Sequence, residues 1–273
     1  YVSRAAWAFF IPGILANFIF GWYPLILGFV VAFQKFHLIK GAYFIGLDNF
    51  RAIFEDPMTV IVFKNTAYYT FLSIVLAFFI PIFVAILLME MKPNTIRIMM
   101  VLWFIPIAGM ASLVIWKWFY QPEYGLLNAI LSGLGLPALR WLLDKRIVIL
   151  CLVLPGIIMY GPGLIYIATL QNVPLELYES AELEGASFWQ KIWHITLPQL
   201  RPLISMMLIL AVIGNMQIFQ LPFVMTGGGP GNASRSVVMF FYSLAFTNLK
   251  FGKGQAIALT LFFSIVILII LQR

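Results

Sequence analysis

The chain has 273 residues, of which 63% are hydrophobic and only 10% are charged. A soluble domain has about 45–50% apolar and about 25% charged residues, so this composition indicates a membrane protein. The formal net charge is +7, but the Lys and Arg residues stand singly at the ends of apolar segments, where interfacial anchors lie. We therefore expect no nucleic-acid partner, because such a partner requires a cationic run or stripe.

Six stretches are apolar enough to cross a bilayer as helices, which takes about 20 residues each. In chain order the predicted spans are Ala5–Phe33, Phe63–Met89, Ile98–Phe119, Ile147–Leu170, Pro198–Val224 and Gln255–Leu271. The predicted fold class is an all-α integral membrane protein with six transmembrane helices. The segments between the spans contain no soluble domain, so we expect a single membrane domain over residues 1–273.

The fourth predicted span contains the sequence "MYGPGLIY", in which Pro162 lies between Gly161 and Gly163. A proline between two glycines should loosen the helix near the middle of the membrane. Such loosening is tolerated where protein or a water-filled cavity satisfies the freed backbone groups. The triplet therefore indicates either a cavity lining or an irregularity of packing.

Residues typical of catalysis are sparse. Cys151 is the one cysteine and lies in an apolar run, so we expect an inert buried thiol. His37 and His194 fall in different loops and form neither a metal spacing nor a nucleophile triad. The glycine run Gly227–Gly231 lacks the Gly-Lys-Ser/Thr of a phosphate-binding loop. We expect no enzyme activity, no metal site and no cofactor bound by this chain.

Ionisable residues are also missing from the middle of the predicted spans, since Lys64, Glu90 and Lys117 all lie near span ends. Carriers coupled to protons or sodium usually need such groups within the membrane. The polar residues inside the spans are neutral, which suits a neutral, hydroxyl-rich solute moved by an external motor. The alternative is a secondary transporter or channel for a small neutral solute.

The segment between the fourth and fifth spans, "YESAELEGASFWQKIWHITLP" (178–198), is unusually acidic. Glu176, Glu179 and Glu182 share one helix face because they are three residues apart. The pattern predicts a short amphipathic helix and then a further turn that ends before Pro198. Gly185 sacrifices about 1 kcal/mol of helix propensity relative to Ala, and close approach of another protein's backbone is a plausible gain. The alternative is an acidic, solvated interfacial loop.

This segment resembles the EAA loop of permease subunits in binding-protein-dependent ABC importers. That loop reads Glu-Ala-Ala, three residues, Gly, nine residues and Ile-x-Leu-Pro. Here Glu179-Ser180-Ala181 is followed by Gly185 and then by Ile195-Thr-Leu-Pro198. Ser180 departs from the pattern, but it replaces one small residue by another.

Two further stretches look like the sugar-importing branch of the family, in particular its maltose-type permeases. "YQPEYGLLNAIL" (120–131) resembles the segment after the third span, and "FVMTGGGPGNAS" (223–234) resembles the turn after the fifth. The resemblance covers the chain from the first span to the sixth.

The resemblance implies a cytoplasmic coupling helix that docks in a cleft of an ATPase subunit. The implied coupling residues are Glu179, Ser180, Ala181, Glu182, Gly185 and Ala186. It also implies a second homologous permease subunit, two ATPase subunits that bind ATP and Mg, an extracytoplasmic solute-binding protein, and a bacterial or archaeal cell membrane. Both termini would then be cytoplasmic. Most of the 17 Lys and Arg residues would lie outside, against the positive-inside rule, and the expected topology follows the spaced motif instead.

The resemblance implies a sugar or oligosaccharide as cargo, although it fixes neither the sugar nor its length, and a phosphorylated polyol or charged saccharide stays open. Asn215 occupies the place where similar permeases contact substrate. The candidate substrate-binding residues are Asn215, Tyr160, Gly163, Ala211 and Ile218. The alternative for Asn215 is an interhelical hydrogen bond, which is common in membranes.

Overall fold

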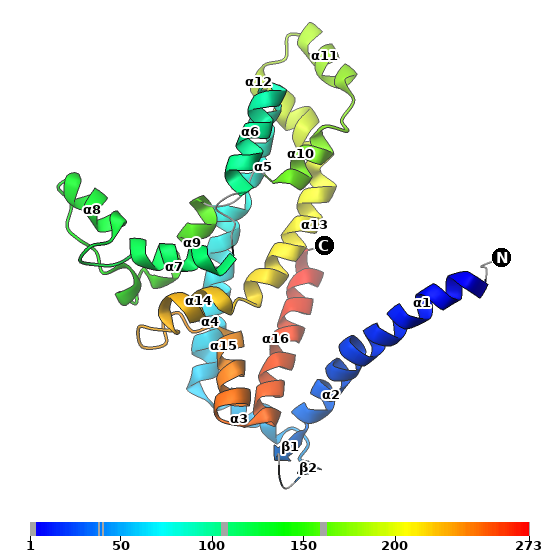
Figure 1. The fold of residues 1–273 in the computed structure, drawn as a ribbon, viewed down its shortest axis with the longest axis vertical. Coiled ribbons are helices and arrows are strands. Elements are labelled where there is room, and N and C mark those ends of the chain that lie inside the picture. Colours follow the sequence, from blue (N-terminus) through cyan, green and yellow to red (C-terminus); the bar gives the residue numbers. More distant parts are fainter. Residues whose placement is uncertain (1–3, 38, 40, 105–108, 159–162, 273) are drawn as a thin grey trace. The chain divides into compact units, whose positions relative to one another are not determined.

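The computed structural model describes residues 4–37, 39, 41–104, 109–158 and 163–272. The described chain is mostly helical, with one two-stranded hairpin (Figure 1). It divides into two compact units. The first comprises Tyr1–Val60 and Val237–Ile267, and the second comprises Ile61–Ser236 and Leu268–Arg273. The single membrane domain stays a prediction, and each unit is described by itself.

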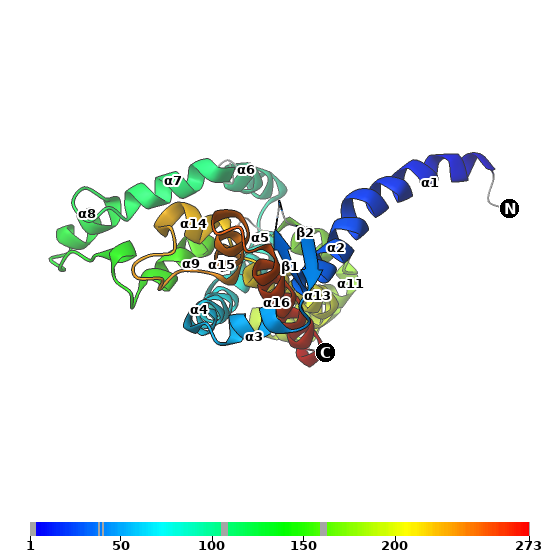
Figure 2. The ribbon, with the colours of Figure 1, turned by 90° about the horizontal axis from the view of Figure 1, so that it is seen from below.

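The first unit combines elements from both ends of the chain. Its elements are α1 (Arg4–Asn17), α2 (Tyr23–Ala32), β1 (Gln34–His37), β2 (Gly41–Phe44), α3 (Asp48–Phe54), α15 (Val237–Tyr242) and most of α16 (Phe251–Gln272). Figure 2 shows the hairpin beside α2 and α16. The strands are antiparallel, with Gln34 opposite Phe44. The hairpin departs from the all-α expectation, which treated this segment as a loop.

Close packing joins the hairpin to α16 within this unit. The Asn49 side-chain amide donates to the carbonyl oxygens of Ala32 at 2.8 Å and Gln34 at 2.9 Å. A Cβ at Gly252 would collide with the Gln34 carbonyl oxygen and with the Asn49 amide. Glycine at the first turn of α16 therefore lets the helix touch the backbone of β1.

The second unit holds the middle of the chain. Its elements are most of α4 (Pro57–Ser73), α5 (Ile80–Met89), α6 (Pro93–Phe104), α7 (Gly109–Phe119), α8 (Leu126–Gly133), α9 (Val148–Ile158), α10 (Leu164–Leu170), α11 (Leu175–Leu183), α12 (Phe188–Lys191), α13 (Leu197–Met216) and α14 (Gln220–Thr226). One buried cluster joins α5, α10 and α13, and includes Ile82, Tyr166 and Leu200. A second includes Trp116 and Cys151, so the lone thiol is buried as expected.

Several prolines in this chain lie within helical runs without ending them. Pro24, Pro81 and Pro198 lie in the first turns of α2, α5 and α13, inside the runs Phe9–Ala32, Pro57–Met89 and Phe188–Met216. Each of these helices follows a π-helical turn. At two of them, the residue before the proline (Tyr23 or Leu197) donates to a carbonyl five residues back. The wider turn lets the helical path continue through the proline.

The continuous helix through Pro198 corrects one prediction. The segment after Gly185 does not end before Pro198, because a π-helical turn at Ile192–Thr196 carries α12 directly into α13. Among the described residues, four helical runs are long and apolar enough to span a membrane: Phe9–Ala32, Pro57–Met89, Phe188–Met216 and Phe251–Gln272. The third and fourth predicted spans each include residues outside the described ranges, so six spans stay a prediction.

Candidate functional site

The acidic segment forms a helical loop whose first helix, α11, ends in a Schellman motif. The Gly185 N–H donates to the Glu182 carbonyl at 3.0 Å, and the Ala186 N–H donates to the Ala181 carbonyl at 2.9 Å. Gly185 adopts φ +78°, the left-handed conformation that this motif requires. The sequence analysis explained Gly185 by the close approach of another protein's backbone. The structure adds a reason within the chain, because this glycine caps α11.

The second helix of the loop, α12, begins with a capping box. The Ser187 hydroxyl accepts from the Gln190 N–H at 3.4 Å, and the Gln190 side chain accepts from the Ser187 N–H at 2.7 Å. These two bonds satisfy amide donors that lack a partner at a helix start. The Ser-x-x-Gln spacing was the sequence signal for this helix start, and the sequence interpretation missed it.

Two side-chain contacts hold α11 against the start of the long α12–α13 run. The Tyr178 hydroxyl lies 3.1 Å from the Thr196 hydroxyl, and the Glu182 carboxylate accepts from the Lys191 ammonium at 2.6 Å. A cavity of about 370 Å³ lies beneath the helix, lined from α5, α10, α11 and α12. The loop is thus fastened at a few points and not packed throughout.

The outer surface of this loop combines exposed carboxylates with exposed apolar side chains. Glu179 is exposed, Leu183 is 91% exposed, and Trp189 is exposed as well. Figure 1 shows α11 beyond the ends of α10 and α12, at one extremity of its unit. Ser180, which departs from the family motif, donates its hydroxyl to the Glu176 carbonyl at 2.7 Å, so the extra polar group is satisfied inside the helix. Acidic and apolar groups together on a projecting helix are chemistry suited to a protein partner.

The candidate substrate residues occupy different surroundings. Tyr160 lies outside the described residues. Gly163 precedes α10 as its N-cap at φ +59°, where a Cβ would lie 3.0 Å from the Cβ of Pro81 in α5. Ala211 packs partly buried against the cluster that joins α5, α10 and α13. Gly163 and Ala211 therefore lie beside one core cluster, whereas Ile218 lines a separate cavity of about 10 Å³.

Asn215 lies at a break in the predicted fifth span. α13 ends at Met216 and α14 begins at Gln220, so the span is not one helix from Pro198 to Val224. The Asn215 side chain is half-buried and makes no hydrogen bond to another residue that the structure describes. A polar side chain beside a helix break can meet a ligand, but the sequence interpretation did not foresee the break.

No group of three or more His, Cys, Asp and Glu side chains that could hold a metal ion occurs among the described residues. The titratable groups of the loop are engaged in a helix dipole, an ion pair or solvent contact. Nothing in this arrangement brings a nucleophile and a base together in the described part of the chain.

Comparison of the sequence with known proteins shows similarity to permease proteins of transport systems. The chain is 31% identical over 247 residues to the sulfoquinovosyl glycerol transport system permease protein SmoG of Agrobacterium fabrum, covering 88% of this chain and 80% of that protein. It is 32% identical over 281 residues to the arabinooligosaccharides transport system permease protein AraP of Bacillus subtilis, covering 99% and 87%. It is 29% identical over 258 residues to the probable ABC transporter permease protein PH1215 of Pyrococcus horikoshii, covering 92% and 88%. No family model matches the chain.

Solved structures show the same fold. A chain in the crystal structure of a bacterial alginate ABC transporter, in complex with an alginate pentasaccharide-bound periplasmic protein, superposes with a TM-score of 0.85. The identity is 22%, over 97% of this chain and 91% of that chain. A second structure, of a bacterial ABC transporter involved in the import of the acidic polysaccharide alginate, gives a TM-score of 0.81 at 23% identity.

Proposed function

This chain belongs to the permease proteins of ABC transporters, and from that membership we propose that it forms half of a pathway that imports a sugar or oligosaccharide. The named cargoes of its relatives support this class, since they are a sulfoquinovosyl glycerol and arabinooligosaccharides. One of these is a charged saccharide and the other is not, so the proposal covers a class of cargo and not one sugar.

The single observation that carries the coupling role is the geometry of α11. It is a short helix, closed by a Schellman motif, that projects from its unit and exposes Glu179 beside an almost fully exposed Leu183. We propose that this helix docks on an ATPase subunit, with Glu179 paired to a basic group there. The proposed coupling set is Glu179, Ser180, Ala181, Glu182, Gly185 and Ala186.

The remaining parts of the proposal follow from that docking. ATP and Mg are bound by two ATPase subunits, and this chain binds no cofactor. A second homologous permease completes the pathway, and an extracytoplasmic solute-binding protein delivers the cargo. The loop and both termini lie on the cytoplasmic side of a bacterial or archaeal cell membrane, which the chain crosses six times.

The coupling role is tested by reconstituting the chain with these partners and measuring ATP-dependent uptake for Glu179→Ala. Truncating one partner of a charge pair at an interface costs about 2 kcal/mol or more, so we expect uptake to fall about 30-fold at limiting ATPase. Glu176→Ala is the matched control, because Glu176 is also exposed on α11 but lies outside the motif. Equal uptake by wild type and both variants would refute the docking role of Glu179.

The need for partners is tested by the purified chain alone in liposomes. We expect no solute uptake, because the described residues offer no nucleotide site and one permease supplies only half of the pathway. Uptake without ATP or partners would show instead that the chain is a secondary transporter or a channel.

A further inference from the structure

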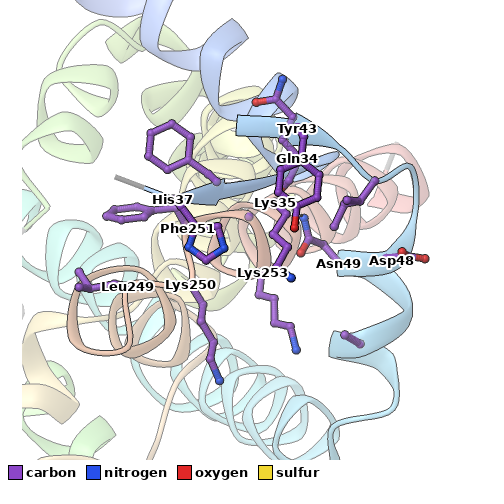
Figure 3. A pocket seen from close by; sticks show the side chains of 14 residues that line it. Gln34, Lys35, His37, Tyr43, Asp48, Asn49, Leu249, Lys250, Phe251 and Lys253 are labelled. Atoms are coloured by element: carbon purple, nitrogen blue, oxygen red, sulfur yellow. The ribbon is translucent and has the colours of Figure 1, made fainter. Parts of the chain in front are cut away.

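The first unit contains a cavity of about 530 Å³ that none of the proposed roles uses. It lies between the β1–β2 hairpin, the start of α3 and the first turn of α16, and all of its lining belongs to this unit (Figure 3). Its charged and titratable lining consists of Lys35, His37, Asp48, Lys250 and Lys253, with the phenol of Tyr43. Three ammonium groups against one carboxylate give the cavity a positive potential.

Two of these lysines, Lys250 and Lys253, come from the same short stretch at the start of α16. Figure 3 shows the side chains of Lys250 and Lys253 extending in the same direction from the start of α16. In this view Asp48 lies beyond Asn49, away from both lysines. The ion pair that the structure records among its described residues does not involve Lys35, Lys250 or Lys253. The Lys35 ammonium lies 5.8 Å from the centre of the Tyr43 ring, so the charges of Lys250 and Lys253 are the ones left for a ligand.

The walls of the cavity are fixed before any ligand arrives. Asn49 bonds the end of α2 to β1, and the Phe36 and Phe251 rings meet edge to face with centroids 5.6 Å apart. Gly252 allows α16 to touch the backbone of β1. A preformed site loses less entropy on binding than one that must be ordered by its ligand.

The cavity is placed where the membrane meets water. Lys35 lies two residues after the predicted first span, and Lys250 and Lys253 flank the start of the apolar helical run Phe251–Gln272. Large apolar side chains of the same unit are exposed around these segments. They are Phe44, Leu47, Phe246 and Leu249. A cationic cavity with exposed apolar neighbours matches an amphiphile that has an anionic head and hydrocarbon tails.

We propose that this cavity binds the phosphate group of a glycerophospholipid, with Lys250 and Lys253 as its main contacts and Lys35 as a further cation. The acyl chains lie along Leu249 at the edge of the cavity and along Phe44, Leu47 and Phe246, which do not line it. A free phosphate ion offers the same anionic chemistry without the tails, and the apolar neighbours favour the lipid.

The test uses the purified full chain in zwitterionic detergent and native mass spectrometry with added dioleoyl phosphatidylglycerol. We expect one saturable lipid on the wild type and binding at least about tenfold weaker for Lys250→Gln/Lys253→Gln, since each lysine near an anionic lipid adds to its attraction. Lys250→Arg/Lys253→Arg keeps the charge and should retain the lipid. The matched control is Arg140→Gln/Arg146→Gln, which removes two exposed cations that do not line the cavity.

Lipid binding that is equal in all four proteins would overturn the proposal, because the contact would then be diffuse. Binding of inorganic phosphate to the wild type, lost in the glutamine variant while lipid binding is unchanged, would assign the cavity to the free ion. A glutamine variant that keeps the lipid but no longer associates with a solute-binding protein would assign it to a protein contact. Loss of lipid from both the glutamine and the arginine variants, with a lowered melting temperature, would show a structural role for the lysines and also overturn the proposal.

Discussion

Gly163 and Gly185 hold the backbone at similar positive φ angles, +59° and +78°, yet their surroundings differ completely. Gly163 is the N-cap of α10, and a Cβ there would collide with Pro81 and Tyr166. A Cβ at Gly185 would meet no atom within 4 Å. The first glycine is required by packing as well as by conformation, and the second by conformation alone. A substitution at Gly185 can therefore test function without disturbing the packing of the fold. A substitution at Gly163 would disturb both.

The largest expected effect is that of Gly163→Ala. The left-handed conformation costs a non-glycine residue about 1–2 kcal/mol, and a Cβ placed 2.7 Å from the Tyr166 ring adds overpacking of similar size, so we expect a loss of about 3 kcal/mol in the free energy of unfolding. Unfolding of the purified chain in mixed micelles measures it. Gly156→Ala is the matched control, because its Cβ would make only an ordinary 3.9 Å contact in the helix α9. A Gly163→Ala variant as stable as that control would contradict the packing argument.

Two substitutions at Gly185 distinguish its role in capping α11 from its proposed role in docking. Gly185→Val strains the left-handed cap by about 2 kcal/mol or more, and so it would impair coupling whether or not a partner approaches this point. Gly185→Asn is the sharper variant, because asparagine tolerates the left-handed conformation. If a partner backbone docks here, Gly185→Asn should keep α11 folded and still lower ATP-dependent uptake.

Circular dichroism and hydrogen exchange at α11 provide the folding readout for that experiment. Wild-type uptake by Gly185→Asn, together with poor uptake by Gly185→Val, would leave Gly185 with a capping role only.

Asn215 lies beside the α13–α14 break, and its replacement tests the proposed cargo contact. We expect Asn215→Leu to lower uptake about tenfold at saturating binding protein, the effect of losing one net hydrogen bond of about 1.4 kcal/mol to the cargo. Asn215→Gln keeps the amide and should recover part of the rate. Tyr160→Phe is the companion variant for the other proposed contact.

Asn215 has two possible roles, a cargo contact or an interhelical hydrogen bond. Stability, cargo preference and the ATPase rate of the assembled transporter distinguish them. A structural role predicts lower stability and unchanged cargo preference for Asn215→Leu. Unchanged rate, preference and ATPase coupling in both the Asn215 and Tyr160 variants would remove these residues from the cargo site.

Features that depend on neighbouring residues could be predicted from the sequence, whereas features that depend on tertiary contacts could not. Long apolar runs predicted helices that the structure has, such as α16, because a helix satisfies its own backbone in hydrocarbon. The Schellman cap at Gly185 involves only neighbouring residues and was within reach of the sequence, but the sequence analysis explained Gly185 by the approach of a partner. By contrast, the contact of Gly252 with the Gln34 carbonyl joins residues far apart in the chain. No local pattern announces such a contact.

The π-helical turns and the α13–α14 break were missed for a related reason. A proline signals a lost hydrogen bond, but the sequence does not say whether the chain kinks, stops or widens by one residue. At Pro198 it widens, as the bond from Leu197 to the Ile192 carbonyl shows. At Gln217–Phe219 a break occurs with no proline or glycine among these three residues. Neither outcome could be predicted from the neighbouring residues alone.

The smallest expected effect concerns Ser187, at the start of α12. Ser187→Ala removes the oxygen that caps the Gln190 N–H, and loss of such a cap costs about 1 kcal/mol. The cost should appear as faster hydrogen exchange at the first amides of α12, with the long α13 helix unaffected. Ser180→Ala is the matched control in the same loop, because Ser180 lies inside α11 and alanine is the better helix former. It also restores the family's Glu-Ala-Ala. Faster exchange in Ser180→Ala than in Ser187→Ala would mean that α11, and not the start of α12, limits the order of this open loop.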